Sequence, residues 1–328
     1  MPPRLRLAHL PTPLWRSDAL DALIGAEVWV KRDDMTAGAA AGNKIRKLEY
    51  LLAEAQAKRA THVITCGAVQ SNHARATAVT AASLGLKSLL LLRTTRSPSA
   101  PHAPVGNLLI DRLVGAETRF ITPAEYRERS ALMEQAASAL AATGARPYVI
   151  PEGGSNGLGA LGYVECLREV RAQLELGLGG GPAPFDAVVH ACGSGGTAAG
   201  VALGARRFGV APVVHAMAVC DDRATFEAST GRIILEATRL APSAGPLADL
   251  VIHDAWKGPA YGVPSDAQKR FIVEVARRTG LIVDPVYSGK ALFALAHLEP
   301  KPARVLFIHT GGLPGLLAES ELFGDALG

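Results

Sequence analysis

The chain has 328 residues, of which 48% are hydrophobic and 20% are charged, and its formal net charge is +4. This length exceeds what one hydrophobic core usually serves, so we expect two lobes, and the composition excludes a chain that is disordered in bulk. The small net charge without a long Lys/Arg run argues against nucleic-acid binding, and the sequence has no apolar stretch long enough to predict a membrane span.

Short apolar runs rich in β-branched residues alternate along the chain with longer segments of helical period. This alternation predicts strand–helix–strand units around a mostly parallel sheet, and therefore an α/β fold with more strands than one small sheet needs. The predicted strands are Glu27–Lys31, His62–Cys66, Ser88–Leu92, Arg119–Ile121, Tyr148–Ile150, Ala187–Ala191, Val213–Val219, Leu250–His253 and Val305–Ile308. The predicted helices are Asn43–Lys58, Ser71–Gly85, Val105–Val114, Pro123–Ala142, Gly157–Leu176, Thr197–Phe208, Ala224–Leu240, Ser265–Thr279 and Gly289–His297.

A glycine-rich turn that follows an apolar strand is the sharpest candidate for a ligand site. The segment Cys192-Gly193-Ser194-Gly195-Gly196-Thr197 enters a helix. Its glycines allow the main chain to wrap an anion at the free N–H groups of the helix start. The turn lacks the lysine of a nucleotide P-loop and the spacing of a dinucleotide fingerprint, so a monophosphate is the better match. Taken alone, it also fits a plain connection without a ligand.

A second turn, residues 66–75, also leads from a strand into a helix. Ser71 is a natural N-cap residue, and Asn72 and His73 fall in the first helical turn. Side chains and free N–H groups at such a position can share a carboxylate or a phenolate oxygen. Capping without any ligand would explain Ser71 equally well.

The third element is the helix that begins around Asn43 and Lys44. The helix macrodipole disfavours a lysine in the first turn, and the same field, together with desolvation, lowers the pKa of its amine towards nucleophilicity. Lys44 is therefore a candidate for a lysine that forms a Schiff base. We expect the neighbouring Arg46 and Lys47 to be solvated or paired with Glu49.

Further motifs accompany these turns in order along nearly the whole chain. They are Leu10-Pro11-Thr12-Pro13-Leu14, Lys31-Arg32-Asp33-Asp34, Gly42-Asn43-Lys44, Gln70-Ser71-Asn72-His73, Gly106-Asn107-Leu108-Leu109, Pro151-Glu152-Gly153-Gly154-Ser155-Asn156, Leu158-Gly159-Ala160-Leu161-Gly162-Tyr163, Tyr261-Gly262-Val263-Pro264, Asp284-Pro285-Val286-Tyr287 and His309-Thr310-Gly311-Gly312. Together they resemble the pyridoxal-phosphate family of D-cysteine desulfhydrase, L-cysteate sulfo-lyase and 1-aminocyclopropane-1-carboxylate deaminase. That family shares the tryptophan-synthase-β fold.

This resemblance implies two open, twisted, mostly parallel sheets flanked by helices. It implies a large cofactor-binding domain of residues 1–47 and 158–328 and a small α/β domain of residues 48–157. The cofactor would be pyridoxal 5'-phosphate. Lys44 would carry it beside Asn43, and Asn72 would contact its phenolic oxygen. The turn at Gly193, Ser194, Gly195, Gly196 and Thr197 would hold its phosphate.

The resemblance also assigns the substrate side of the site. Ser71, Asn72 and His73 would receive the substrate carboxylate, with Ser71 close to the catalytic step. Tyr261 and Tyr287 would line the reacting face. Without the resemblance, packing with a satisfied hydroxyl would explain both tyrosines equally well.

Ser288 and Thr310 discriminate between activities within the family and are expected beside the cofactor. Deaminases of the cyclopropane substrate are expected to have Glu and Leu at these positions. A hydroxyl near the pyridine nitrogen cannot protonate it as an acid would, so β-elimination fits better than ring opening. We therefore expect D-cysteine to be converted to pyruvate, sulfide and ammonia.

L-Cysteate sulfo-lyase is the first alternative activity, and the cyclopropane deaminase is the second. A sulfonate would need a cation beyond His73, for which Arg75 or Arg223 are the candidates that the sequence offers. An alternative from another class is a catalytically silent binding protein that kept the fold. The intact Lys44 and glycine turn argue against that alternative.

The expected surroundings follow from the same residues. The four cysteines, Cys66, Cys166, Cys192 and Cys220, lack paired spacing, which argues against a metal knuckle or a disulfide framework. With no recognisable signal segment, a reducing cytoplasm is the simplest location. The expected partner is a small amino-acid substrate, without a metal, nucleic acid or membrane, and the resemblance implies a homodimer.

Overall fold

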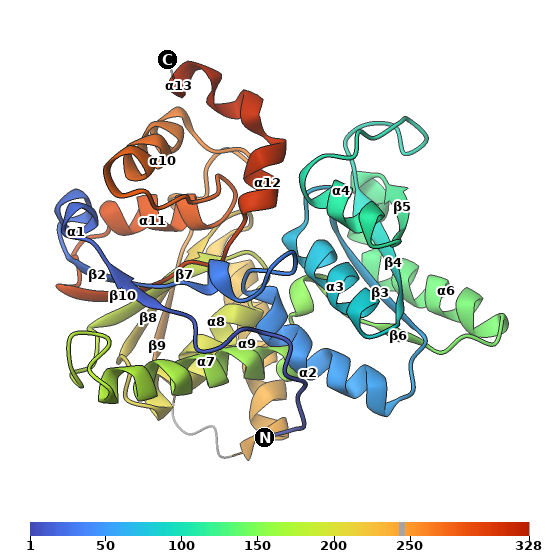
Figure 1. The fold of residues 1–328 in the computed structure, drawn as a ribbon, viewed down its shortest axis with the longest axis horizontal. Helices are drawn as coiled ribbons and strands as arrows, with labels where there is room; N and C mark the ends of the chain where they lie inside the picture. Colours follow the sequence, from blue (N-terminus) through green and yellow to red (C-terminus); the bar gives the residue numbers. More distant parts are fainter. Residues whose placement is uncertain (243–246, 328) are drawn as a thin grey trace.

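The computed structural model describes residues 1–242 and 247–327. Within these residues the chain forms two separate sheets with helices on both faces of each (Figure 1). The larger sheet has the strand order β1-β2-β10-β7-β8-β9, and the smaller has the order β5-β4-β3-β6. The two sheets confirm the α/β fold that the sequence predicts.

The strands of the large sheet are β1 Leu14–Arg16, β2 Glu27–Lys31, β7 Ala187–Cys192, β8 Val213–Ala218, β9 Asp249–His253 and β10 Arg304–Ile308. Those of the small sheet are β3 His62–Ala68, β4 Lys87–Arg93, β5 Glu117–Ile121 and β6 Pro147–Val149. Neighbouring strands in the described chain run parallel, except that β1 pairs antiparallel with β2. The carboxyl ends of parallel strands therefore meet at one edge of each sheet.

Helices cover both faces of the large sheet. Its helices are α1 Asp18–Ile24, α7 Gly157–Glu175, α8 Gly196–Arg207, α9 Arg223–Leu240, α10 Asp266–Thr279, α11 Ser288–Ala296, α12 Leu313–Ala318 and α13 Gly324–Leu327. Apolar side chains of α1, α10 and α11 form one core with β2, β7 and β10, and side chains of α7 and α8 form another with β7, β8 and β10. Strands buried on both faces explain why the sequence shows continuous apolar runs there.

The small sheet is covered in the same way by α2 Lys44–Ala57, α3 Asn72–Ser83, α4 Gly106–Leu113, α5 Pro123–Arg127 and α6 Arg129–Ala142. Alternate residues of β3 point to opposite faces, as the strand period of two requires. Val63 packs with apolar residues of α2 and α3, whereas Ile64 and Cys66 pack with residues of α6. Short 3-10 turns at Asp33–Met35, Glu152–Gly154 and Ser320–Phe323 complete the described elements.

Helix α2 belongs to both packing units. Leu48 and Leu51 lie in the core beneath the small sheet, whereas Tyr50 packs with α7, α8 and α9 of the large lobe. The domain boundaries at residues 47/48 and 157/158 stay a prediction, because α2 and the start of α7 hold the two units together.

Several elements differ from the sequence prediction. β1, α1 and α12 were not predicted, because each is short and three to seven residues are too few to establish a period. The predicted helix Pro123–Ala142 is two helices, separated at Glu128, which has φ −97° and ψ 20°. Proline at the start and a Thr122–Glu125 capping box define the short α5.

The prediction for Arg46 was wrong, since the residue is buried rather than solvated. Its guanidinium donates to Asp33 at 2.7 Å and to Glu169 at 2.9 Å, while Glu49 accepts from Arg4 at 3.2 Å. Burial alone would raise the pKa of Asp33, but the Arg46 charge holds that pKa below its ordinary value. This buried network fixes the first turn of α2 against the large lobe.

Candidate active site

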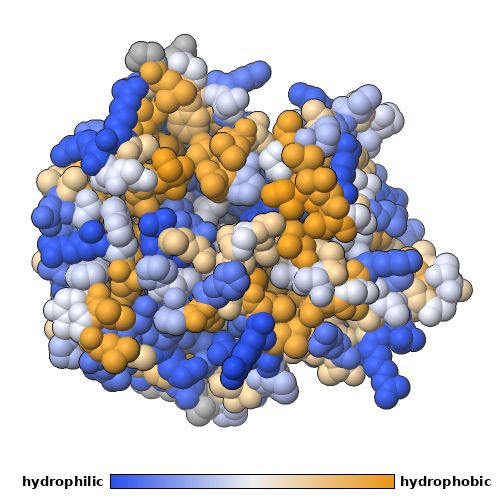
Figure 2. Space-filling view, viewed as in Figure 1, coloured by the Kyte–Doolittle hydropathy of each residue, from blue (hydrophilic) through white to orange (hydrophobic). Residues whose placement is uncertain are grey.

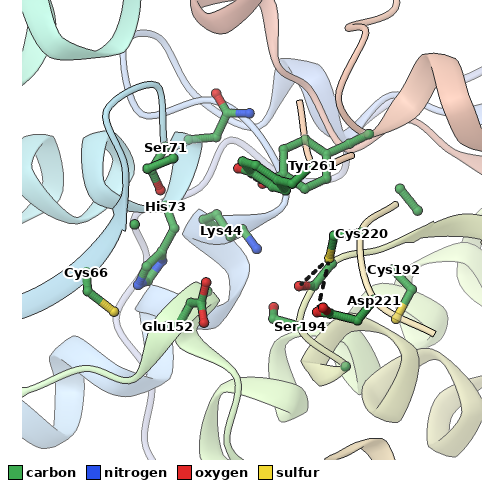
Figure 3. Close-up of a pocket in the computed structure, with 18 of the residues that line it drawn as sticks. Lys44, Cys66, Ser71, His73, Glu152, Cys192, Ser194, Cys220, Asp221 and Tyr261 are labelled. Carbon is green, nitrogen blue, oxygen red and sulfur yellow. Dashed lines mark hydrogen bonds between the residues drawn. The ribbon is translucent and has the colours of Figure 1, made fainter. Parts of the chain in front are cut away.

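A cavity of about 480 Å³ lies where the carboxyl ends of β3 and β7 meet the first turns of α2, α3 and α8 (Figure 3). Most of the residues predicted to form the site come together on its wall. They are Asn43, Lys44, Ser71, Asn72, His73, Gly193, Ser194, Gly195, Thr197, Tyr261, Tyr287 and Thr310. Gly196 and Ser288 are the predicted residues that do not line the cavity in the described structure.

Lys44 is the first residue of α2, as the sequence predicts, and its amine points into the cavity (Figure 3). Burial lowers the pKa of this amine to about 8, against the opposing effect of Glu152 and Cys192. Lys290 also has a pKa lowered to about 8 by burial, but its amine donates to the carbonyl oxygens of Lys257 and Ala260, outside the cavity. Lys44 therefore combines a lowered pKa with access to a ligand.

The glycine turn forms the start of α8 and brings main chain to the cavity. Gly195 has φ +79°, a conformation that side chains disfavour, and a Cβ there would lie 2.9 Å from Thr230 Oγ1. Asn43 donates to Thr197 Oγ1 at 3.2 Å, which ties the lysine segment to this turn. The free N–H groups at the start of α8 can bind an anion.

Lys47 is a site residue that the sequence reasoning missed, and the expectation that it is solvated was wrong. It is buried, and its amine donates to Gly153 O at 3.1 Å and Ser155 Oγ at 3.3 Å. Ser155 Oγ lies 2.8 Å from Ser194 Oγ, so the amine stands directly behind the glycine turn. Residues three apart share a helix face, so the spacing from Lys44 was a signal for this position.

Lys47 has a pKa far below its ordinary value, because it is buried and lies near the charge of Lys44. An anion bound at the glycine turn would compensate for the buried charge that protonation creates. The position of this amine favours a dianionic group such as a phosphate at the turn.

The turn before α3 has the predicted cap. Ser71 Oγ accepts from Ala74 N at 3.2 Å, and the first-turn N–H groups of Asn72 and His73 lie at the cavity wall. His73 Nε2 lies 2.9 Å from Thr65 Oγ1, which donates to Ile150 O. Burial, together with the charges of Lys44 and Lys47, lowers the pKa of His73 well below its ordinary value. His73 is therefore neutral and supplies no cation for a carboxylate or a sulfonate.

Tyr261 lies across the cavity from Ser71 (Figure 3). Its hydroxyl oxygen is 2.7 Å from that of Tyr287, which also lines the cavity. Burial raises the pKa of Tyr261 to about 12, although Tyr287 and Arg93 oppose the rise. Burial raises the pKa of Tyr287 well above its ordinary value. Both hydroxyls are thus protonated near neutral pH, and either can donate to a ligand.

The structure adds a charged group to the wall that the sequence reasoning did not identify. Arg93 lines the cavity with its guanidinium over the rings of Tyr126 and Tyr261, at 5.0 and 5.2 Å from their centroids. Glu152 accepts from Tyr126 at 2.5 Å and from Arg129 at 2.8 Å. These residues come from four separate elements, so no local pattern in the sequence joins them.

The arginines proposed from the sequence have other roles. Arg75 donates to Ala41 O at 2.8 Å and does not line the cavity. Arg223 pairs with Glu227 at 2.6 Å on the exposed face of α9. The cation for an anionic substrate group therefore has to come from elsewhere, and Arg93 is placed to supply it.

Ser288 is the first residue of α11. Its buried hydroxyl donates to Asp284 Oδ1 at 2.5 Å, while the Asp284 carboxylate also accepts from the main chain of Val286 and Tyr287. The carboxylate thereby fixes the segment that presents Tyr287. Contact between Ser288 and a cofactor stays a prediction, whereas Thr310 does reach the cavity.

Comparison with known proteins identifies the family. Residues 5–311 match the family model described as "Pyridoxal-phosphate dependent enzyme". The chain belongs to the pyridoxal-phosphate dependent enzymes. This enzyme is 42% identical to "Bifunctional D-cysteine desulfhydrase/1-aminocyclopropane-1-carboxylate deaminase, mitochondrial" of Arabidopsis thaliana, over 98% of its own length and 81% of that protein's. It is 39% identical to the D-cysteine desulfhydrase of Yersinia enterocolitica, with 96% of each chain covered.

Among solved structures, the fold matches "Crystal Structure Analysis of the ACC deaminase homologue" with a TM-score of 0.85 and 37% sequence identity. The match covers 99% of this enzyme and 95% of that chain. It confirms the predicted architecture of two mostly parallel sheets flanked by helices, and the family confirms pyridoxal phosphate as the cofactor.

The cavity fits this cofactor. An amine of lowered pKa at Lys44 suits its aldehyde, and the glycine turn backed by Lys47 suits its phosphate. Among the described residues, no group of three or more His, Cys, Asp or Glu side chains is arranged to hold a metal ion. The described chain also contains no helix with the length and apolar character of a membrane span.

Proposed function

We propose that this enzyme is a lyase that removes a sulfur substituent from the β-carbon of a small amino acid, with D-cysteine as its substrate. The products would be pyruvate, sulfide and ammonia. The observation that carries the proposal is the amine of Lys44, with its pKa lowered to about 8, facing a cavity bounded by the glycine turn and the Tyr261–Tyr287 pair. The names of the relatives at about 40% identity support the choice of D-cysteine.

Lys44 has two tasks in this proposal. When bound, pyridoxal phosphate holds amines through its aldehyde carbon and withdraws electrons from the substrate α-carbon. Lys44 Nζ would be the amine that holds the cofactor, and as a free amine beside the bound substrate it would accept the α-proton. A pKa of about 8 suits both tasks, because a substantial fraction of the amine is unprotonated near neutral pH.

The start of α3 and the tyrosine pair hold the rest of the substrate. The free N–H groups of Asn72 and His73, with the Ser71 hydroxyl, would receive the carboxylate at the positive end of the helix dipole. The hydroxyls of Tyr261 and Tyr287 would lie beside the β-substituent. Burial raises the pKa of both hydroxyls, so both stay protonated and one of them would protonate the departing thiolate.

Arg93 supports L-cysteate as a second candidate substrate. A sulfonate needs a cation near the β-carbon, and Arg93 brings a guanidinium to the cavity beside Tyr261. Glu152 is held by Tyr126 and Arg129, so it does not neutralise Arg93 directly. This geometry favours the sulfonate substrate over the cyclopropane substrate, which has no anionic group beyond its α-carboxylate.

Steady-state kinetics with D-cysteine, L-cysteine, L-cysteate and 1-aminocyclopropane-1-carboxylate test the proposal. We expect D-cysteine to have the highest kcat/KM and the cyclopropane amino acid the lowest. Exchanging Ser288→Glu together with Thr310→Leu should raise the relative rate with the cyclopropane substrate. An enzyme that prefers the cyclopropane substrate, or a double variant with an unchanged order, would contradict the proposal.

We also propose that the enzyme works as a homodimer in the cytoplasm. Figure 2 shows apolar side chains gathered over α4 and α12. The large apolar residues exposed on these helices and at the N-cap of α4 are Val105, Leu109, Leu113, Leu313 and Leu317. Such a patch favours a protein partner. Analytical ultracentrifugation should give twice the chain mass, and Leu113→Lys with Leu317→Lys should give the monomer.

The cellular location is a proposal from the sequence, and the Arabidopsis relative is named as mitochondrial.

A further inference from the structure

Asn107 on α4 lies between the buried Arg75 and the site residue Asn72, without lining the cavity itself. It is fully buried, and its side-chain oxygen accepts from Arg75 Nε at 2.7 Å. Its side-chain nitrogen donates to Gln70 O at 3.0 Å and to Asn72 Oδ1 at 3.1 Å. Every polar atom of this amide therefore has a partner, and α4 is joined to the first turn of α3.

The direction of these hydrogen bonds is fixed by the arginine. A guanidinium can only donate, so the Asn107 atom that faces Arg75 must be the oxygen. The Asn107 nitrogen then faces Asn72 and donates to it. Asn72 must consequently accept through Oδ1, which leaves its own NH₂ group to point elsewhere.

Asn72 lies on the cavity wall, so a fixed amide orientation has a consequence for the cofactor. If its NH₂ group faces the cavity, Asn72 can donate to a phenolate oxygen. If the amide were reversed, it would present an oxygen to that phenolate and repel it. The two orientations of Asn72 are therefore opposite in their effect on the cofactor.

We propose that Arg75 and Asn107 are positioning residues that hold the Asn72 amide with its NH₂ group towards the phenolic oxygen of pyridoxal phosphate. This rests on the proposed contact between Asn72 and the cofactor. Arg75 also donates to the carbonyl oxygens of Ala39 and Ala41, just before the Lys44 segment. One buried guanidinium thus aligns both the lysine that bonds to the cofactor and the amide that orients its phenolate.

The test is Asn107→Asp in the holoenzyme. The carboxylate keeps the bond from Arg75 but cannot donate, so Asn72 should reverse to donate to Asp and turn its oxygen to the cavity. The readout is the pH midpoint of the visible absorption of the bound cofactor. We expect the midpoint to rise by about 1–2 pH units, the range for losing a hydrogen bond to a charged group.

A double-variant cycle separates orientation from a general structural effect. Asn72→Ala should shift the midpoint upwards by itself, and adding Asn107→Asp to it should produce no further shift. An additional shift in the double variant, or an unchanged midpoint in Asn107→Asp beside a shifted Asn72→Ala, would overturn the proposal. An unchanged midpoint in Asn72→Ala would instead remove the proposed contact of Asn72 with the cofactor.

Arg75→Lys is the second variant, should Asn107→Asp fail to fold. It keeps the positive charge but removes the guanidinium donors that serve Asn107 and the two carbonyl groups together. The Asn107 amide would then be free to reverse, and the midpoint should move in the same direction by a smaller amount. A midpoint identical to that of the parent enzyme would contradict the role of Arg75.

Discussion

The two walls of the cavity are built from different material. The large-sheet wall, residues 192–195 with Thr197 and Thr310, is a glycine-rich turn with short side chains at the ends of β7 and β10. The small-sheet wall, Arg93 with Tyr126, Arg129 and Glu152, consists of long side chains from β4, α5, α6 and the turn after β6. The large-sheet wall presents main-chain groups to a ligand, whereas the small-sheet wall presents charged side chains.

This difference separates two functions. Main-chain N–H groups recognise a phosphate in the same way whatever the substrate, and the glycines they need tolerate few substitutions. Arg93, Arg129 and Glu152 at the opposite wall lie outside the hydrophobic core of the small sheet. We therefore expect the large-sheet wall to hold the cofactor phosphate, and the charged side chains of the small-sheet wall to contribute to substrate preference.

The largest effect is expected from breaking the large-sheet wall with Gly195→Val. The φ of +79° and the close approach of Thr230 leave no room for a side chain, and strain of about 1–3 kcal/mol corresponds to a loss of roughly 5- to 150-fold in cofactor affinity. Retention of the cofactor after dialysis, followed by absorbance, measures this loss. Gly231→Ala in α9 is the matched control, since nothing lies within 4 Å of its added Cβ. Equal affinity in the Gly195 variant and the parent would mean that the turn is a plain connection.

Changing the small-sheet wall should affect substrates unequally. Arg93→Gln is expected to lower kcat/KM for L-cysteate by about 10- to 100-fold, because the sulfonate loses a charge-assisted bond, with a smaller loss for D-cysteine. Cofactor affinity should be unchanged. Arg127→Gln, which alters an exposed arginine at the rim, is the control. Equal losses for both substrates would show that Arg93 supports the fold of the wall rather than the choice of substrate.

The pH dependence of cofactor attachment tests whether burial lowers the pKa of the Lys44 amine. A pKa of about 8 means that the reactive, unprotonated amine increases up to roughly tenfold between pH 7 and pH 9 and then levels off. Stopped-flow absorbance after mixing cofactor-free enzyme with pyridoxal phosphate should show this midpoint. A rate that keeps rising through pH 10 would indicate an ordinary, solvated lysine.

The smallest effect concerns Asp111, buried behind the small-sheet wall on α4. No hydrogen-bond partner is found for its carboxylate among the described residues, and burial raises its pKa to about 7 although Arg75 opposes the rise. The folded state thus binds a proton that the unfolded state releases, so this contribution to stability is present below about pH 4 and is lost as the pH rises through 7. The melting temperature of Asp111→Asn relative to the parent should therefore increase by several degrees from pH 4 to pH 8, since 1 kcal/mol corresponds to about 1.5 °C for a chain of this length. A constant difference between variant and parent across this range would contradict the raised pKa.

The same contrast explains how much the sequence could predict. The glycine turn, the Ser71 cap and Lys44 were recognisable because each depends on a few consecutive residues after a strand. Arg93 and Glu152 could not be recognised from the sequence. The small sheet places β4 and β6 on either side of β3, and only this arrangement brings the two residues to one cavity. Arg46 was misjudged for the same reason, since its partners Asp33 and Glu169 lie on other elements.

Ser288 shows a different limit. The motif around Tyr287 predicts contact of Ser288 with the cofactor, and the structure adds that its hydroxyl donates to Asp284 four residues earlier, so this contact stays a prediction. A sequence motif fixes the position of a residue on the fold, but the reach of the side chain then decides what it contacts.

Reduction with borohydride followed by peptide mass spectrometry tests the central claim most directly. Lys44, Lys47 and Lys290 are all lysines with a pKa lowered by burial, but Lys44 is the one among them that lines the cavity. We predict that the reduced cofactor is found on Lys44 alone and that Lys44→Ala abolishes the adduct. Finding the cofactor on Lys47, Lys290 or any other lysine would contradict the assignment of the site.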